Sequence, residues 1–514
     1  MKKLKYILLS TVLLGLCSCS AFDDMNKNPY EPDDTDLLPD NYGLGLFFQQ
    51  MQNSAICTVQ NDYQLCENLV GDTYGRYMTQ TNEAWNSQSF ATFNAPINWL
   101  NANFNVVFPN IYGPWFKIKE VTNSVGHQYA WAQILRVFAM QRLTDKYGPI
   151  PYSQVSGGSI TVAYDSQEDV YRHMFEDLDA AIDVLKKFIE SNPGSKPMAK
   201  YDLVYQGDYA KWIKFANSLK LRMAIRIVYA DGELAKKKAE EAVNDSFGVF
   251  EAVEDNANLI IKSNPIYKMW APYKDTRVCA DLISYMNGYS DPRREKYFQK
   301  SSFAGFDYVG LRTGINIKNK DWALDYSAPN IWDTDLLLPW MNAAEIYFLR
   351  AEGALRGWNM SGTAVDLYNE GIRNSFKQWG VAGAEDYIVD DLSVPDEYND
   401  PNKQNSNARM SDITIKWLDN GSFERNLEQI ITQKWIAMWP IGQEAWSEYR
   451  RTGYPKFMPV VVNNGGEAIL KTELARRIPY AITEFDNNQE NYLKAVQLLG
   501  GPDSYTTKLW WDKK

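Results

Sequence analysis

The chain has 514 residues and is acidic, with 64 Asp and Glu against 53 Lys and Arg and a formal net charge of −11. An acidic surface repels nucleic acid and anionic lipid headgroups, so neither is an expected partner. Five cysteines are too few for a scaffold held together by disulfides. A chain of this length can bury a sizeable hydrophobic core without them.

The first eighteen residues are typical of a cleaved export signal. Three lysines precede an apolar stretch from Tyr6 to Leu16. As a helix this stretch would reach only ~16 Å, too short for the ~30 Å hydrocarbon core of a membrane. Leu16 and Ser18 precede Cys19 as in a lipobox, where the cysteine becomes the first mature residue and carries acyl chains such as palmitate. We therefore predict a signal peptide at 1–18 and lipidation of Cys19, with an ordinary secretory signal as the alternative.

An acidic segment, residues 19–39, follows the lipidation site. It contains six acids and a single lysine among Asn and Pro residues, so we expect an extended, solvated tether. Acids directly after a lipidated cysteine resemble the signal that sends some Gram-negative lipoproteins to the outer face of the outer membrane. The alternative is an acidic linker that contains no export signal. No second linker of this kind follows, so residues 40–514 are expected to form one domain.

Helical periodicity is strong in several stretches of this domain. Apolar residues at i, i+3, i+4 and i+7 run through residues 171–189, with Ser166 and Asp169 as a capping pair before them. Similar apolar stripes cover residues 212–227, 339–355, 365–376 and 427–438. Pro339 is expected to open the second of these, and the short break at 357–362 predicts an antiparallel helical hairpin. The pattern indicates a mostly all-α fold.

Two long regions, 60–115 and 262–335, lack sustained periodicity and are rich in aromatic and polar residues. Loops of this length in a compact domain are usually functional, and the many aromatic residues argue against disorder. Trp212 lies on an apolar stripe and is expected in the core. Five other tryptophans lie among polar residues in the two regions: Trp85, Trp99, Trp270, Trp322 and Trp332.

These tryptophans suggest a sugar site, because a sugar ring is recognised by a flat apolar plate edged with hydrogen-bond donors and acceptors. The alternative is that the rings only pack the loops. The two regions form one site only if the fold brings them together. We predict that the ligand is held by six side chains: Trp85, Trp270, Tyr273, Trp322, Asp275 and Arg277.

Motifs for catalysis or metal binding are missing from the sequence. Neither His127 nor His173 has neighbouring metal ligands, and no Gly-x-Ser-x-Gly elbow, phosphate loop, His-Glu-x-x-His or Cys-x-x-Cys occurs. We therefore predict no catalytic residue, no metal site and no cofactor, and the missing motifs weaken the hypothesis of an enzyme without removing it. A glycoside hydrolase needs only two carboxylates, which keeps that alternative open. The sequence also leaves open whether Cys57 and Cys66 form a disulfide.

Several segments resemble the SusD/RagB family of surface glycan-binding lipoproteins. The lipobox and residues 22–29 are similar to the N-terminus of this family. The other matching segments are Thr144–Tyr152, Trp212–Arg226, Met341–Glu352, Trp446–Pro455 and Leu509–Asp512. The matches follow one another from residue 19 to residue 512, so the resemblance covers almost the whole chain.

The resemblance implies one α-helical domain of tetratricopeptide-like hairpins, with long irregular loops on one side. It also implies an outer-membrane lipoprotein that captures oligosaccharides and delivers them to a TonB-dependent transporter of the SusC type, without being an enzyme. Some relatives take up peptides, so a peptide ligand is an alternative. Because the matching segments lie in the helical scaffold, a structural role is expected for Trp446, Arg450, Arg451, Trp510 and Trp511.

Overall fold

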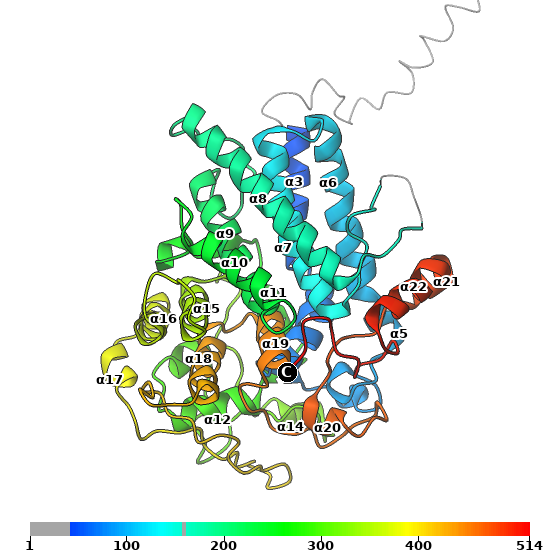
Figure 1. Cartoon of the computed structure of the whole chain (residues 1–514). Coiled ribbons are helices and arrows are strands. Elements are labelled where there is room, and N and C mark those ends of the chain that lie inside the picture. The colour runs from blue at the N-terminus through cyan, green and yellow to red at the C-terminus, as the bar shows by residue number, and fades with distance from the viewer. Residues whose placement is uncertain (1–41, 157–160) are drawn as a thin grey trace, which may run out of the picture. The chain divides into compact units, whose positions relative to one another are not determined.

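The computed structural model describes residues 42–156 and 161–514, and Phe47–Lys514 form one unit. The predicted signal peptide, Cys19 and the tether lie outside the described residues. Pairs of long helices follow one another along the unit (Figure 1). The helix α7 packs against α6 and α8, α9 against α8, α10 and α15, and α15 against α16 and α18. Their bounds are α6 Phe108–Thr122, α7 Gly126–Tyr147, α8 Gln167–Ser191, α9 Tyr209–Arg226, α10 Gly232–Val243, α15 Ala343–Leu355, α16 Ala364–Gln378 and α18 Phe423–Ala437.

Side-chain caps fix where these helices begin. Ser166 accepts a hydrogen bond from the backbone N–H of Asp169 at 3.1 Å, which confirms the capping pair predicted before α8. Thr363 caps α16 in the same way. The predicted hairpin is also present, because α15 and α16 are joined by a short turn and pack against each other. Among the described residues, no helix combines the length and the apolar composition needed to cross a membrane.

The predicted helix start at Pro339 is wrong. Residues Leu337–Met341 form strand β4, which pairs antiparallel with β2 (Ala257–Ile260). The helix begins after Asn342, whose side chain accepts a hydrogen bond from the N–H of Glu345 at 2.8 Å. Proline at the first turn of a helix and proline at a strand edge give the same local sequence signal. The pairing with β2 decides between them.

The region 60–115 is more helical than its sequence suggests. Its C-terminal part forms a continuous helical run through α5 (Ile97–Ala102), the π-helical η5 (Asn103–Val107) and α6, and its N-terminal part contains α4 (Gln60–Tyr63) and the π-helical η2 (Gln64–Asp72). A π-helical segment shifts the side-chain register relative to a 3.6-residue period. The apolar residues therefore do not repeat at α-helical spacing, and the periodicity is lost although the helix continues.

A buried network of charges joins the long helices. Arg226 of α9 contacts three carboxylates, those of Asp145 (3.2 Å), Glu444 (2.5 Å) and Glu448. Lys434 lies 3.1 Å from Glu448. Each of these side chains is almost completely shielded from solvent. Isolated buried charges are very costly, so each charge in this network depends on its partners.

The network explains the residue types in the family-like segments. Arg222 pairs with Glu345 at 2.7 Å, and Arg451 pairs with Glu352 at 2.6 Å. The indole N–H of Trp511 donates to Asp145 at 2.9 Å, so the C-terminal segment closes over the same network. All five matching segments of the domain supply residues to this core. The structural role expected for Arg451 and Trp511 agrees with their complete burial.

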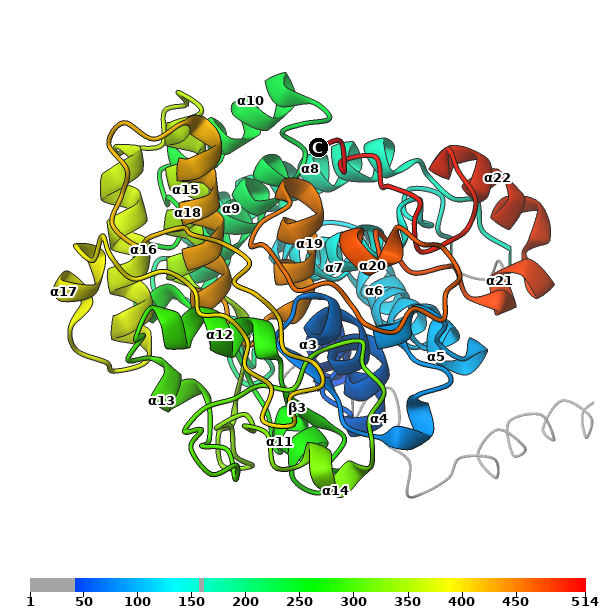
Figure 2. The ribbon, with the colours of Figure 1, turned by 90° about the horizontal axis from the view of Figure 1, so that it is seen from below.

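Irregular segments from distant parts of the sequence lie together on the side seen in Figure 2. The strand β1 (Met78–Gln80) pairs antiparallel with β3 (Thr276–Val278). A separate hydrophobic cluster under these loops includes Leu311, Ile317 and Tyr326. Short elements here and at the C-terminus are η3 Glu83–Trp85, α11 Pro265–Trp270, α12 Ala280–Gly288, α14 Lys320–Ala323, α17 Ala384–Ile388, α19 Gly442–Thr452, α20 Leu470–Glu473, α21 Ile482–Asn487 and α22 Gln489–Leu499.

Candidate ligand-binding surface

The two aromatic regions of the sequence meet in the fold. Beyond the β1–β3 pair, the side chain of Asn86 donates to the carbonyl of Ile317 at 2.8 Å and accepts from its N–H at 2.8 Å. The backbone N–H of Thr81 donates to the carbonyl of Asp275 at 3.1 Å. These bonds hold the loop that carries Trp85 against the loop that leads into α14. The fold therefore brings regions 60–115 and 262–335 together, as a single site formed by both would require.

Trp85 is half-buried at the end of η3. Its ring meets the buried Trp99 edge to face, with ring centroids 5.0 Å apart. The neighbouring Glu83 and Ser87 are exposed. Contact with Trp99 fixes the orientation of the indole, while part of its surface stays open to solvent. A fixed, partly open aromatic ring is suited to stacking on a ligand.

Trp322, on α14, resembles Trp85 in its burial and in its contact with a second aromatic ring. It is half-buried and meets Tyr326 edge to face at 5.3 Å, at the margin of the Leu311 cluster. Asn319 caps the helix by accepting a hydrogen bond from the N–H of Trp322 at 2.8 Å. The helix is held further by Lys320, whose ammonium donates to the carbonyl of Tyr273 at 2.8 Å.

Tyr273 borders an open hollow of about 280 Å³. Its hydroxyl shares its one hydrogen between the side-chain oxygens of Gln60 at 3.0 Å and Asn61 at 3.3 Å, and both residues line the hollow. The amide nitrogens of these two side chains donate no hydrogen bond to the part of the chain that the structure describes. They are therefore available to hydrogen-bond a ligand. Sequence reasoning missed Gln60 and Asn61, because a single amide side chain at the start of a short helix carries no pattern.

Trp270 does not offer a free ring. Only 9% of its surface is exposed, and its indole N–H donates to the carbonyl of Ile331 at 2.7 Å. Its ring packs edge to face against Tyr267 and Trp332. Polar neighbours in the sequence suggested an open ring, but the ring itself is buried against Tyr267 and Trp332. We therefore assign Trp270 to packing.

Asp275 and Arg277 are also occupied. The carboxylate of Asp275 accepts from Lys320 at 2.6 Å and from Gln64 at 3.0 Å. The guanidinium of Arg277 donates to the backbone carbonyls of Leu324 and Trp270, and burial lowers its pKa to about 10. Both residues are more than nine-tenths buried. They fix the loops that carry Trp322 and Tyr273, and they are not placed to form the polar edge of a ligand site.

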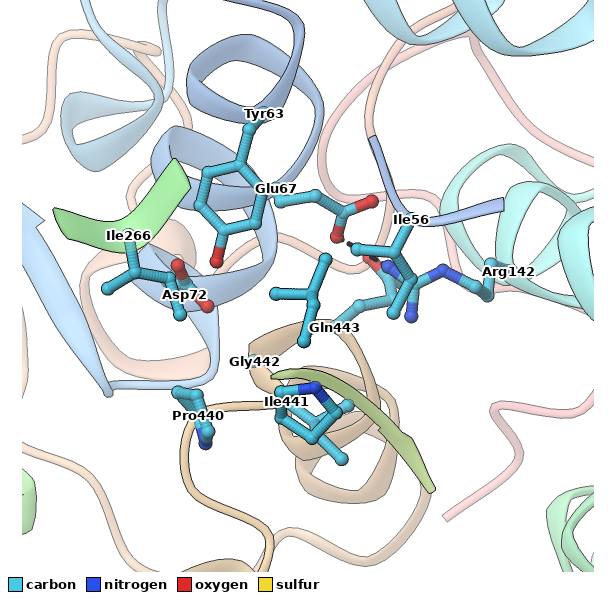
Figure 3. A pocket seen from close by; sticks show the side chains of 12 residues that line it. Ile56, Tyr63, Glu67, Asp72, Arg142, Ile266, Pro440, Ile441, Gly442 and Gln443 are labelled. Atoms are coloured by element: carbon cyan, nitrogen blue, oxygen red, sulfur yellow. Dashed lines mark hydrogen bonds and ion pairs between the residues drawn. The ribbon is translucent and has the colours of Figure 1, made fainter. Parts of the chain in front are cut away.

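A small pocket lies between η2, α7 and the segment that enters α19 (Figure 3). Glu67 pairs with Arg142 on its wall, and burial raises the pKa of Asp72 well above its usual range. Neither polar atom of the buried Gln443 amide has a hydrogen-bond partner in the described chain. The accessible volume, about 20 Å³, is room for about one water molecule. This pocket is too small for a sugar.

Neither histidine belongs to a metal site in the described residues. His127 is partly buried, its Nδ1 lies 2.9 Å from the hydroxyl of Tyr209, and burial lowers its pKa. His173 lies on the exposed face of α8 beside Glu176. Cys57 and Cys66 are free thiols and both are buried. The described residues contain no cluster of three or more His, Cys, Asp or Glu side chains that could hold a metal ion.

A family model described as "Susd and RagB outer membrane lipoprotein" matches residues 24–512 of the chain. The chain belongs to the SusD/RagB family. The sequence resemblance is thereby confirmed, and with it an association with the outer membrane. Members of this family are binding proteins and not enzymes, so this SusD-like protein is not an enzyme, as the sequence resemblance implies.

Solved structures of SusD homologs agree in fold. One from Bacteroides uniformis is 43% identical, covers 92% of this chain and 100% of its own, and has a TM-score of 0.88. A chitin-binding homolog from Flavobacterium johnsoniae is 39% identical over 92% of this chain and 99% of its own, with a TM-score of 0.89. One from Bacteroides thetaiotaomicron is 40% identical over the same shares, with a TM-score of 0.87. No curated protein sequence matches the chain. The mostly helical fold predicted from the sequence is confirmed.

Proposed function

We propose that this SusD-like protein captures oligosaccharides at the cell surface and delivers them to a TonB-dependent transporter of the SusC type. The observation that carries the proposal is that Trp85, Trp322 and Tyr273 are partly exposed aromatic rings on neighbouring loops. These three half-buried rings come from loops that hydrogen bonds hold together, and the hollow at Tyr273 has free amide donors in Gln60 and Asn61.

This combination suits the chemistry of a sugar. The face of an indole or phenol ring packs on the C–H face of a pyranose, and amide groups pair with its hydroxyls. The rings are held by packing and by caps before a ligand arrives. Little side-chain entropy is then lost on binding, which favours affinity.

A peptide ligand is less well supported. A site for basic peptides needs carboxylates, and none lines the hollow at Tyr273, although the whole chain has a net charge of −11. The groups that do line it are amides, hydroxyls and a valine side chain. The chitin-binding relative also supports a glycan ligand. Calorimetric titration of the purified protein with oligosaccharides and with peptides separates the two ligand classes.

The lipid anchor at Cys19 and exposure on the outer face of the membrane are parts of the same proposal. Cys19→Ala should leave the protein soluble or stalled in export, because no described helix can anchor it in a membrane. Fractionation of cells that express each form, followed by immunoblotting, measures the effect.

Intact cells that carry the native protein should also lose it to added protease. The Cys19→Ala protein serves as the control for release from the membrane. Recovery of this variant in the outer-membrane fraction at the native level would refute the anchor. Full protection of the native protein on intact cells would place it on the periplasmic face.

A further inference from the structure

A second, larger hollow continues from the one at Tyr273. Its volume is about 490 Å³, and it shares Thr58 and Ser263 with the first. We call this second hollow the Leu203 groove, lined by Gln49, Asn53, Thr58, Leu203, Ile260 and Lys262. The Leu203 groove is within the usual size range of a small-molecule pocket, and it adjoins the hollow at Tyr273 where Thr58 and Ser263 line both.

The floor of the Leu203 groove is apolar. The backbone N–H of Ile260 donates to the carbonyl of Leu203 at 2.9 Å, which holds the two residues side by side. Ile260 is 40% exposed, an unusual exposure for a large aliphatic side chain in a strand. An exposed apolar floor bordered by polar groups is a common feature of ligand-binding grooves.

The rim of the groove is polar but contains no carboxylate. The side chain of Gln49 makes no hydrogen bond to the described chain, and Lys262 is exposed and pairs with no acid there. Thr58 donates to the side-chain oxygen of Asn53 at 3.1 Å, and Asn53 donates to the carbonyl of Gln49 at 2.8 Å. Gln49 and Lys262 therefore have polar groups available, while Asn53 and Thr58 are already ordered.

The walls belong to regular structure. Gln49 and Asn53 lie one turn apart on α3 (Tyr42–Ala55), and Ile260 ends β2. The side chain of Gln52 on the same helix accepts from the N–H of Leu203 at 2.8 Å, which ties the floor to the helix. The groove is therefore already formed in the absence of a ligand.

We propose that the Leu203 groove binds the outer sugar units of an uncharged oligosaccharide whose first units lie at Tyr273. This proposal rests on the proposed function. The apolar floor packs on the C–H faces of the sugar rings, and Gln49 and Lys262 hydrogen-bond their hydroxyls. A chain long enough to pass Thr58 gains these contacts, and a disaccharide does not. The protein then selects its ligand by length.

Calorimetry with the full mature domain tests the proposal. The probes are two-unit and six-unit oligomers of N-acetylglucosamine, glucose, xylose and mannose. The native protein should bind its preferred six-unit oligomer about tenfold more tightly than the two-unit one, or more. Ile260→Lys, which places a long charged chain in the groove, should remove most of this difference and leave two-unit binding unchanged.

Gln49→Ala should weaken six-unit binding about threefold without affecting two-unit binding. The matched control is Leu392→Lys, at an apolar residue that is 86% exposed elsewhere on the surface, and it should behave as native. If Ile260→Lys lowers the melting temperature, Gln49→Ala still tests the groove, because its side chain holds no structural bond.

Equal affinity of the native protein for both lengths would contradict the binding of sugar units in the Leu203 groove. It would not contradict the proposed function. Unchanged six-unit binding in Gln49→Ala and in a folded Ile260→Lys would likewise contradict binding in the groove and not the proposed function. If the native protein binds none of the eight probes and no oligosaccharide of a glycan array, both the groove and the capture of uncharged oligosaccharides are overturned. Hydrogen exchange with the six-unit ligand gives a second measurement, with slower exchange expected at residues 58–61 and 260–263.

Discussion

Arg226→Met should lower the free energy of unfolding by about 3–5 kcal/mol. The substitution keeps an unbranched apolar side chain and removes the guanidinium group with its charge. The carboxylates of Asp145, Glu444 and Glu448 then lose a shared partner inside the core. Breaking one side of a buried ion pair is costly, because the remaining charge is neither solvated nor paired. Urea or thermal unfolding monitored by circular dichroism measures the loss.

The loss of unfolding free energy in Arg226→Met should depend on pH. Burial alone would raise the pKa of Glu448, but the nearby Arg451, Lys434 and Arg226 outweigh it and hold this pKa well below its usual range. Burial would raise the pKa of Glu444 as well, but Arg226, Arg222 and Lys434 outweigh it and lower this pKa. A folded pKa below the unfolded value of about 4.3 adds stability above that pH, and the added stability is lost as the pH falls. The difference in free energy of unfolding between the native protein and Arg226→Met should therefore become smaller below about pH 4.

Arg172→Met is the matched control for this variant. Arg172 also pairs with two acids, Glu168 and Asp231, but it is 43% exposed at its side chain. Exposed ion pairs contribute little to stability, because solvent screens them. We expect no large change in the free energy of unfolding of Arg172→Met. Equal unfolding curves for Arg226→Met and the native protein would show that the buried network does not stabilise the fold.

Trp85→Ala and Trp322→Ala should each weaken oligosaccharide binding by about 2 kcal/mol or more, which is roughly thirtyfold in affinity. Each substitution removes a half-buried ring on which a sugar would stack. Both should keep most of the native stability, since part of each ring already faces solvent. Calorimetric titration and melting temperature, measured on the same samples, separate the two effects.

Trp270→Ala is the control for this pair. Its ring is buried and its indole N–H is bonded to Ile331, so truncation should destabilise the fold by about 3–5 kcal/mol. Native affinity in both Trp85→Ala and Trp322→Ala would place the ligand elsewhere. A melting temperature well below the native value in either variant would show that its ring serves packing, as the ring of Trp270 does.

The helices could be predicted from the sequence where one face of each is apolar. The stripe at 171–189 and the cap at Ser166 define α8 almost to the residue. The strand β4 could not be predicted, because its partner β2 is distant in the sequence and Pro339 is compatible with either structure. The π-helical segment η5 was also hidden, because it shifts the apolar residues out of register.

The site was harder to predict than the fold. Sequence context can show that a tryptophan has polar neighbours, but it cannot show where they point. Trp85 and Trp270 look alike in the sequence, yet one is half-open and the other packs against Tyr267 and Trp332. The segments that identify the family supply the buried ions of the scaffold instead. For that reason a confident family assignment gave no information on the ligand residues.

The central claim is that the protein captures oligosaccharides and leaves them intact. The soluble form without residues 1–19 should be titrated in a calorimeter with the hits of a glycan array, and the ligand then recovered and analysed by mass spectrometry. We expect saturable binding to at least one oligosaccharide and recovery of that ligand at its original length. Binding to peptides but to no glycan would contradict the account, as would recovery of a shortened oligosaccharide.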